Sequence, residues 1–326
     1  MSNIKSVDFV CKIDIPTGDA VYEIKSVILD NGKDVTSLAE IKCNADIKIC
    51  DKTVTVPCDY RQNNDVVTLT AIYSDKKYDF TIKFSKWQLV FEDDFDGDQL
   101  DKLKWEHCPP FLRDKGFANY WHEEFSFVKD GCLVSRAYDT GGLDNRGKVV
   151  NLSGAIQTRG LFEHSYGYYE MYARPHQITG MWGAFWLVTG DMEDPDADDG
   201  TAEYGAEIDI AEILKPWGVS QIVHWDGWGD NTKSEDFHDY AAHIDIFDGK
   251  FHKFAFRWTP DEYIFLIDDV VTHRSNAGGI CKVPGYMLVT TECGTWGGDW
   301  VLKEGEHSDM LVDYVKVWST DDDFKG

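Results

Sequence analysis

The sequence predicts an all-β protein in which a large β-sandwich or jelly roll follows a small N-terminal β-sandwich. Short runs rich in β-branched and aromatic residues recur along the 326 residues, and turn residues separate them. No long amphipathic helix and no internal repeat interrupts these runs. Strands without alternating helices over about 240 residues favour a sandwich or jelly roll over an α/β fold.

Residues 1–86 are predicted to form the small sandwich. Turn signals such as Asp30-Asn31-Gly32 separate its short β-type runs, which are residues 21–24, 47–49, 53–56, 66–72 and 78–82. The phrase DNGKDVT at residues 30–36 resembles a turn of bacterial immunoglobulin-like modules. The segment has no tryptophan and no acidic constellation, so we expect a scaffold role rather than weak glycan attachment.

Residues 87–326 are predicted to form the larger domain. Its pattern begins at residues 87–91, and later strands are expected at residues 166–173, 251–258, 263–267 and 310–318. No Pro/Gly-rich linker marks the junction, so the boundary depends on the change of pattern alone.

Composition excludes some partners. The formal net charge of −26 argues against nucleic acid and anionic membrane surfaces, and it disfavours strongly anionic glycans. A neutral polysaccharide or oligosaccharide fits this charge. Aromatic residues at 14% suit sugar stacking and an ordinary β core alike. We expect a monomer.

The cysteines and the N-terminus bear on the compartment. The chain has eight cysteines, an even number that permits disulfides, but free thiols in a reducing setting are expected. None has CxxC spacing, which argues against a zinc or thioredoxin-like site. Residues 1–10 contain no long apolar run of a signal peptide or membrane span. The chain is therefore expected to be cytoplasmic, or secreted with its leader removed.

The most informative segment is the hexapeptide Glu207-Ile208-Asp209-Ile210-Ala211-Glu212. It interleaves three acids with apolar residues and contains no turn residue, which is typical of a strand with one acidic face. Aligned carboxylates repel and raise one another's pKa, so structure alone gives little reason for them. Glycoside hydrolysis needs one ionised and one protonated acid. A solvated acidic edge strand is the alternative.

The spacing of the acids carries a structural prediction. On a regular strand Glu207 and Asp209 share a face and Glu212 points away. One extra residue, a β-bulge, would return Glu212 to that face. The sequence therefore predicts a bulge between Asp209 and Glu212 if all three acids serve one site.

Several segments in order resemble glycoside hydrolase family 16, in the branch with a bulged motif that includes laminarinases and agarases. Besides the acidic hexapeptide, these segments are residues 90–97, 154–158 with 166–170, 180–187 (GMWGAFWL), 251–260 and 312–317 (VDYVKV). The resemblance covers about residues 87–320. It implies a β-jelly roll with a glycan cleft across its concave face.

The resemblance also implies roles for the acids. Glu207 would be the nucleophile, and Glu212 would be the general acid and then the general base. Asp209 would lie between them and tune their protonation. Ionised neighbours raise the pKa of the last acid and keep it protonated until it is needed, so the three would titrate as a coupled set.

Three tryptophans are expected to contact substrate. Trp182 matches the family's sugar-stacking residue near the cleavage point, with a core tryptophan as the alternative. Trp186 suits the core or the cleft wall equally. Trp296 resembles the "GG-W" loop of relatives, but Thr290-Thr291-Glu292 stands where relatives often carry an asparagine. That departure leaves the sugar open.

Three polar residues complete the expected substrate contacts. His224 resembles a cleft histidine of the family, with a structural histidine as the alternative. Asn119 and Arg159 are candidates for contacts with sugar hydroxyls.

The resemblance implies no cofactor for catalysis but a structural calcium ion away from the cleft. The matching positions are Asp94, Gly131 and Asp313, and calcium prefers oxygen ligands. The acidic loop at residues 191–199 is a second candidate, although its spacing is not that of an EF-hand.

The sequence thus predicts a retaining endo-β-glycanase acting on a neutral β-glucan with β-1,3 or mixed β-1,3/1,4 linkages. Three alternatives stay open: an endo-β-galactosidase acting on galactans or host glycans, a transglycosylase, and a non-catalytic carbohydrate-binding protein on the same fold. The intact trio of acids argues against the last.

Overall fold

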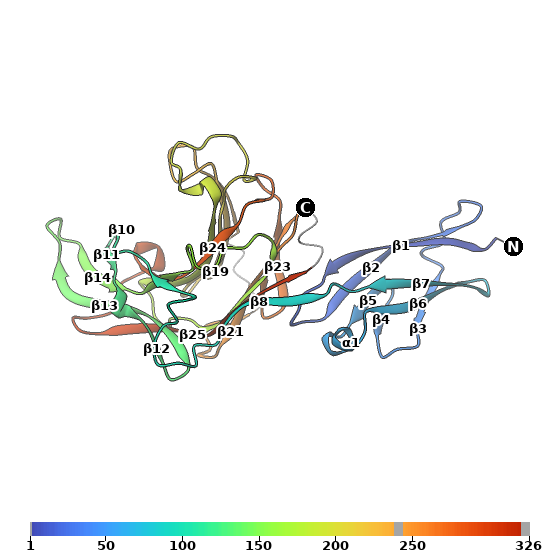
Figure 1. The fold of residues 1–326 in the computed structure, drawn as a ribbon, viewed down its shortest axis with the longest axis horizontal. Coiled ribbons are helices and arrows are strands. Elements are labelled where there is room, and N and C mark those ends of the chain that lie inside the picture. The colour runs from blue at the N-terminus through green and yellow to red at the C-terminus, as the bar shows by residue number, and fades with distance from the viewer. Residues whose placement is uncertain (1, 238–243, 321–326) are drawn as a thin grey trace. The chain divides into compact units, whose positions relative to one another are not determined.

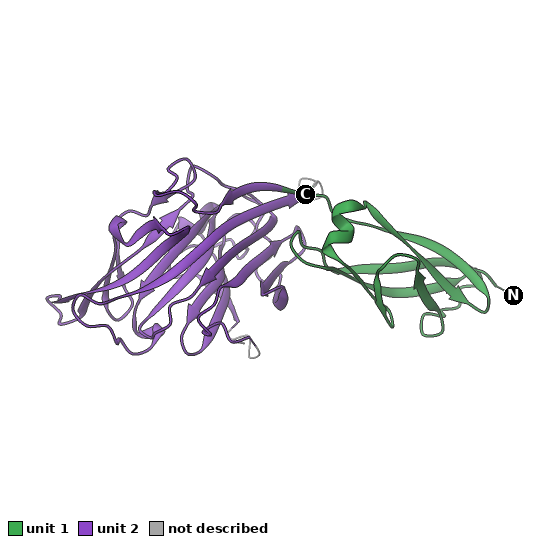
Figure 2. Ribbon diagram, turned by 90° about the horizontal axis from the view of Figure 1, so that it is seen from below, with its two compact units in different colours: residues 1–88, 320–325 green, residues 89–319, 326 purple. Residues whose placement is uncertain are grey.

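The computed structural model describes residues 2–237 and 244–320 and confirms an all-β chain. The described residues up to Gln88 form one compact unit, and Leu89–Ser319 form the other (Figure 2). Among the described residues, no helix has the length and apolar character needed to cross a membrane.

The first unit contains two small sheets. One has the strand order β1 (Ile4–Ile13), β2 (Ala20–Leu29), β5 (Thr53–Val56) and β4 (Lys48–Cys50), and the other has β3 (Glu40–Cys43), β6 (Val66–Tyr73) and β7 (Lys76–Lys83). The short helix α1 spans Cys58–Asn63. The alternation of buried and exposed residues in β2 and β6 gives the unit its own core, which includes Tyr22, Val54 and Leu69. Its immunoglobulin-like character stays a prediction.

The second unit is a β-jelly roll of two sheets (Figure 1). The larger sheet has the order β10 (Leu112–Asp114), β11 (Ala118–Trp121), β14 (Val149–Ser153), β13 (Cys132–Leu143), β25 (His307–Thr320), β16 (Gly167–Arg174), β21 (His252–Trp258), β22 (Tyr263–Ile267) and β23 (Val270–Ser275), with β12 (Ser126–Lys129) beside β13 and β8 (Trp87–Asp93) beside β25. The smaller sheet has the order β20 (Lys233–Phe237), β19 (Gly218–Trp225), β18 (Glu207–Leu214), β17 (Met181–Thr189), β24 (Gly285–Cys293), β15 (Ala155–Gln157) and β9 (Glu106–His107). Short 3₁₀ turns span η1 (Glu123–Phe125), η2 (Gly190–Glu193) and η3 (Thr295–Gly297).

The main core lies between these two sheets. Phe185 and Ile208 of the smaller sheet belong to the same fully buried cluster as Tyr169 and Phe256 of the larger sheet. Side chains alternate along a strand, so the opposite face of β17 and β18 is left for other residues. That face carries a second apolar cluster, rich in tryptophan, beside the acids of β18.

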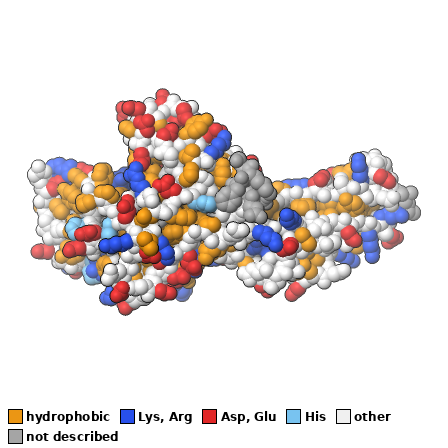
Figure 3. Space-filling model, in the orientation of Figure 1, with side chains coloured by type: hydrophobic (Ala, Val, Ile, Leu, Met, Phe, Trp, Pro, Cys, Tyr) orange, Lys and Arg blue, Asp and Glu red, His pale blue; other side chains and the backbone are white. Residues whose placement is uncertain are grey.

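The surface mixes charges of both signs. On the face shown in Figure 3, Lys and Arg side chains are interspersed among the more numerous Asp and Glu side chains. The overall charge of −26 is therefore a weak guide to one cleft, and the local side chains decide what binds there.

Candidate active site

Strand β18 carries the bulge that the sequence predicts. Asp209 faces Ile222 of β19, whereas Glu212 faces Ser220, so three steps along β18 match two along β19. The pairing of β18 with β17 shifts register at the same place. The extra residue confirms the predicted bulge between Asp209 and Glu212.

The bulge brings the three acids to one hollow. Ile208, Ile210 and Ile213 point into the core between the sheets. Glu207, Asp209 and Glu212 line a common hollow on the opposite face of the smaller sheet. One extra residue thus keeps the apolar face continuous while it moves Glu212 beside the other acids.

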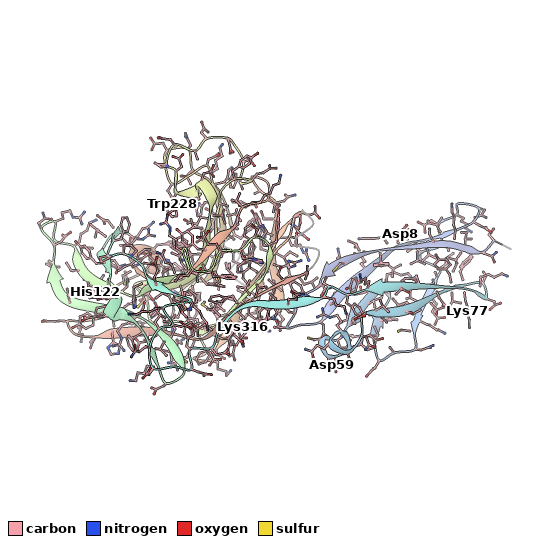
Figure 4. All side chains as sticks on the ribbon, viewed as in Figure 1. Asp8, Asp59, Lys77, His122, Trp228 and Lys316 are labelled. Carbon is pink, nitrogen blue, oxygen red and sulfur yellow. The ribbon has the colours of Figure 1, made fainter. Side chains whose placement is uncertain are left out.

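Polar partners hold each acid in place. Trp182 Nε1 donates a hydrogen bond to Glu212 Oε1 at 3.2 Å, and Trp228 Nε1 donates one to Glu207 Oε2 at 2.5 Å. Trp228 follows β19 and is labelled in Figure 4. His224 Nε2 lies 3.4 Å from Asp209 Oδ2 and 3.8 Å from Glu207 Oε1.

Burial and mutual repulsion raise the proton affinity of the two glutamates. Burial, followed by the charge of Asp209, raises the pKa of Glu207 above its usual value. Burial and the charges of Asp209 and Glu207 raise the pKa of Glu212 well above its usual value. The arrangement can therefore hold a protonated Glu212 close to an ionised carboxylate.

The same negative charges also raise the pKa of the neighbouring histidine. Burial opposes a charged ring at His224, but its hydrogen bond to Asp209 and the charges of Asp209 and Glu207 raise its pKa. A protonated His224 would balance part of the negative charge on the cleft floor.

Hollows lie on both sides of the acids. One contains Glu207 and is lined also by Trp121, Arg159, Trp186, Glu193, Trp228 and Tyr286. The other contains all three acids and is lined also by Lys115, Trp182, His224, Trp228 and Trp296. An open cleft that continues past the acids in both directions can hold a chain rather than a chain end.

The predicted aromatic residues all lie at this cleft. Trp296 is 38% exposed and packs edge-on against Trp182 at 5.2 Å between ring centroids. Trp182 and Trp186 are almost buried, although both contribute to the lining. The Trp186 indole donates to Thr290 Oγ1 at 3.1 Å.

Of the predicted polar residues Arg159 and Asn119, only Arg159 lies at the cleft. Arg159 lines the hollow on the Tyr286 side, with its guanidinium paired to Glu193 at 2.6 Å and above the Tyr286 ring. Asn119 is fully buried on β11 and its amide donates to Ser153 Oγ at 3.0 Å. Asn119 lines neither hollow, so the structure does not support the predicted contact between its amide and sugar.

Sequence reasoning missed other cleft residues, notably Arg113, Lys115, Trp228, Tyr286 and the side chain of Glu292. Trp228 lies four residues after His224, and this closeness in sequence to a predicted cleft residue is the one feature that could have marked Trp228 as a cleft residue. Arg113 comes from the short edge strand β10, and no motif marks it.

One group of side chains at the acids has the geometry of a metal site. Ligand atoms of Glu207, Asp209 and His224 all lie within 4.8 Å of one another, and this is the only such group of three among residues 2–237 and 244–320. The acidic loop 191–199 therefore forms no such group in the described part of the chain. Carboxylates crowded for acid–base chemistry produce the same geometry.

The predicted calcium ligands lie on the larger sheet. Asp94 follows β8, Gly131 lies between β12 and β13 with φ +74°, and Asp313 lies in β25. Burial and the charges of Asp94 and Asp96 raise the pKa of Asp313, although Lys316 Nζ lies 2.9 Å from Asp94 Oδ1. Concentrated negative charge of this kind fits a hard cation.

Comparisons with known proteins agree with this geometry. Residues 115–316 match the family described as Glycosyl hydrolases family 16. The chain is 33% identical over 234 residues to the endo-1,3-1,4-beta-glycanase EglC of Rhizobium meliloti, which covers 69% of this chain and 44% of that protein. The chain therefore spans less than half of that relative's length.

Two further similarities come from other organisms. A keratan-sulfate endo-1,4-beta-galactosidase of Sphingobacterium multivorum is 23% identical over 252 residues, covering 73% of this chain and 56% of that protein. The catalytic domain of a Thermotoga petrophila endo-1,3-beta-glucanase has a similar structure, with a TM-score of 0.59, 24% identity, and coverage of 73% of this chain and 99% of that one. The last similarity supports the jelly-roll fold.

Proposed function

Because this chain belongs to glycosyl hydrolase family 16, we propose that it is a retaining endo-β-glycanase that hydrolyses internal bonds of a neutral β-glucan with β-1,3 or mixed β-1,3/1,4 linkages. The observation that carries the proposal is the bulge of β18, which sets Glu207, Asp209 and Glu212 on one cleft floor. The similarity to EglC supports the choice of glucan.

The reaction proceeds by double displacement. Glu207 attacks the anomeric carbon while Glu212 gives its proton to the departing glycosidic oxygen, so a covalent glycosyl–Glu207 ester forms and the first product leaves. Glu212, now ionised, takes a proton from water, whose oxygen displaces Glu207. Two inversions retain the β configuration, and the carboxyl groups suffice without a cofactor.

The surroundings of the acids fit this division of roles. Glu212 has the more strongly raised pKa, so it is the acid that keeps its proton. The charge of Asp209 contributes to that shift. His224 and the Trp228 indole both favour the ionised form of Glu207, as a nucleophile requires.

Chemical rescue tests the roles of the two glutamates. We expect Glu207→Ala and Glu212→Ala to lose turnover by several orders of magnitude. Thermal unfolding curves that match the wild type would exclude loss of the fold as the cause. With an activated aryl glycoside and azide, Glu207→Ala should yield an α-glycosyl azide and Glu212→Ala a β-glycosyl azide. The reverse assignment of products would contradict the proposed roles.

A panel of purified polysaccharides tests the substrate. We expect reducing ends from laminarin or barley mixed-linkage glucan, with medium-length oligosaccharides appearing first, because the cleft is open beyond the acids in both directions. Release from neither glucan would refute the proposed substrate. Product chromatography with an added acceptor sugar would detect a transglycosylase.

One observation favours a second candidate, an endo-β-galactosidase. The similar protein of Sphingobacterium multivorum is named a keratan-sulfate endo-1,4-beta-galactosidase. Release from galactans in the same panel, without release from glucans, would select it. Binding without turnover on every polysaccharide would instead support a carbohydrate-binding protein.

The remaining proposals concern the rest of the chain. We infer a structural calcium ion held by Asp313, with Asp94 and Gly131 beside it, that supplies charge compensation to the larger sheet. We also propose that the chain is a monomer and that its first unit is a scaffold. Light scattering tests the first of these two proposals, and truncation tests the second.

A further inference from the structure

A partly buried ion pair lies on the cleft floor beside the catalytic acids. Arg113 of β10 reaches Glu292 of β24, with Nε 2.9 Å from Oε1 and 3.1 Å from Oε2. Glu292 is 3% exposed and faces Trp182 across the β17–β24 ladder. Arg113 lines the same hollow as Glu207, Asp209 and Glu212. The double displacement assigns no role to this pair.

The guanidinium is held in place, yet most of its donors are free. Its carbon lies 5.0 Å from the ring centroid of Trp121 and 5.9 Å from that of Phe111. Nε is taken by Glu292, but within residues 2–237 and 244–320 no protein acceptor bonds to Nη1 or Nη2 of Arg113. A rigid fork with four unused N–H groups in an open cleft is suited to bind oxygen atoms of a ligand.

The charges around this fork determine which ligand suits it. Glu292 neutralises the charge of Arg113, so the pair offers donors without a net positive charge. The same hollows also contain Glu207 and Asp209, which would repel an anion, and Lys115 and His224, which would attract one. A carboxylate or sulfate on the sugar would therefore find no excess positive charge here, whereas uncharged hydroxyl oxygens could still accept hydrogen bonds from Arg113.

We propose that Arg113 binds the hydroxyl oxygens of the glycosyl residue beside Glu207, and that Glu292 is the positioning residue that makes this contact selective for an uncharged sugar. The inference deepens the proposed function and rests on it. It gives the departure at Glu292 a physical role, because a glutamate there turns an arginine into a neutral donor group.

Substitution of Arg113 tests the contact. Arg113→Gln should lower kcat/KM on the cleaved glucan by about 10- to 100-fold, as expected when hydrogen bonds from a charged donor are lost. Arg113→Lys should lose nearly as much, because a lysine keeps the charge without the fork. Arg146→Gln is the matched control, since Arg146 pairs with Asp114 of the same strand β10 and lines neither hollow. Wild-type KM and kcat in Arg113→Gln would overturn the proposal.

Substitution of Glu292 tests the selectivity. In Glu292→Gln the amide oxygen can still accept a hydrogen bond from Arg113, but the pair then carries the uncompensated positive charge of the guanidinium. The two substrates are neutral glucan and the same glucan partly oxidised to the C6 uronate. At low salt, we expect Glu292→Gln to raise kcat/KM on the oxidised glucan, relative to kcat/KM on the neutral glucan, severalfold over wild type. The double variant Arg113→Gln/Glu292→Gln should lose this gain. An unchanged ratio in Glu292→Gln would refute the role of Glu292.

The pH profile separates positioning from a merely structural role. Glu212 faces Asp209 and Glu207 on its own strand, Trp182 on β17 and Glu292 on β24. The charge of Glu292 helps to raise the pKa of Glu212, so its removal should move the alkaline limb of the kcat/KM profile to lower pH. A loss of folded protein would instead lower kcat/KM by the same factor at every pH. A wild-type enzyme inactive on every glucan would refute the proposed function instead, so the two failures are distinguishable.

Discussion

At the scale of single residues, the two indoles that contact the acids set the pH range of the reaction. Trp228 donates to Glu207 and Trp182 donates to Glu212, and each hydrogen bond favours the ionised carboxylate. The nucleophile must be ionised and the acid protonated, so kcat/KM should follow a bell-shaped pH profile. Both limbs should lie above the range of ordinary carboxyl groups, because burial raises the pKa of both.

Removing one indole N–H at a time should move one limb at a time. Trp228→Phe removes a bond that lowers the pKa of Glu207, so that pKa rises and the acidic limb moves to higher pH. Trp182→Phe removes the bond that lowers the pKa of Glu212, so the alkaline limb moves to higher pH. Initial rates on a soluble oligosaccharide across pH measure both limbs.

Trp217→Phe is the control for these variants. Trp217 is partly exposed, as Trp228 is, but it lines neither hollow. Its pH profile should match that of the wild type. Movement of the same limb in Trp228→Phe and Trp182→Phe would contradict the separate roles of Glu207 and Glu212.

At the scale of elements, the bulged acidic strand was predictable, whereas a mostly exposed strand and a contact between distant strands were not. The hexapeptide encodes its bulge locally, because the count of residues between Asp209 and Glu212 breaks strict alternation. Strand β1 is not predicted, because its mostly exposed residues lack a clear alternation. Arg113 and Glu292 meet across 179 residues, and no local pattern encodes such a contact.

The close approach of the two sheets at β17 gives an element-scale prediction. A Cβ built on Gly183 would lie 2.3 Å from Met310 Sδ of β25, so any larger residue there would force the Met310 side chain to shift between the layers. We expect Gly183→Ala to lower the free energy of unfolding of the jelly roll by about 1–3 kcal/mol through overpacking. Urea denaturation followed by tryptophan fluorescence measures this change.

The matched control is Gly97→Ala. The nearest atom to a Cβ at Gly97 would be 3.5 Å away, which is ordinary contact, and no positive φ is recorded there. Its unfolding midpoint should stay within the error of the wild type. A wild-type midpoint for Gly183→Ala would mean that Met310 can move aside at no cost.

At the scale of the whole molecule, negative charge is concentrated at two separate places with different expected responses to cations. Around Asp313, a calcium ion would relieve repulsion and stabilise the fold. At Glu207, Asp209 and His224 the ligand atoms are close enough for a metal, but the proposed reaction uses the carboxyl groups themselves.

Chelation should therefore separate stability from catalysis. After EDTA treatment we expect a lower Tm that added calcium restores, with unchanged kcat at 25 °C. Asp313→Asn should remove the effect of calcium on Tm. Loss of turnover on chelation, measured below the unfolding transition, would show that the cluster at Glu207 holds a required metal.

The division into two units leads to the last prediction. Each unit has its own core, one of residues between Ile4 and Phe84 and the other between Phe91 and Val317. All residues that line the hollows beside the acids lie in the second unit. A first unit that acts as a scaffold contributes nothing to the contacts of a short, soluble substrate.

Removal of residues 1–86 should therefore leave kcat and KM on soluble oligosaccharides within about twofold of the full chain, while the fluorescence of the jelly-roll tryptophans stays native. Pull-down on insoluble glucan provides the complementary measurement, since a scaffold should not change the bound fraction. A large fall in the bound fraction with unchanged kcat would instead assign glycan attachment to the first unit. A fall in kcat on short substrates with native fluorescence would contradict the placement of the whole reaction in the second unit.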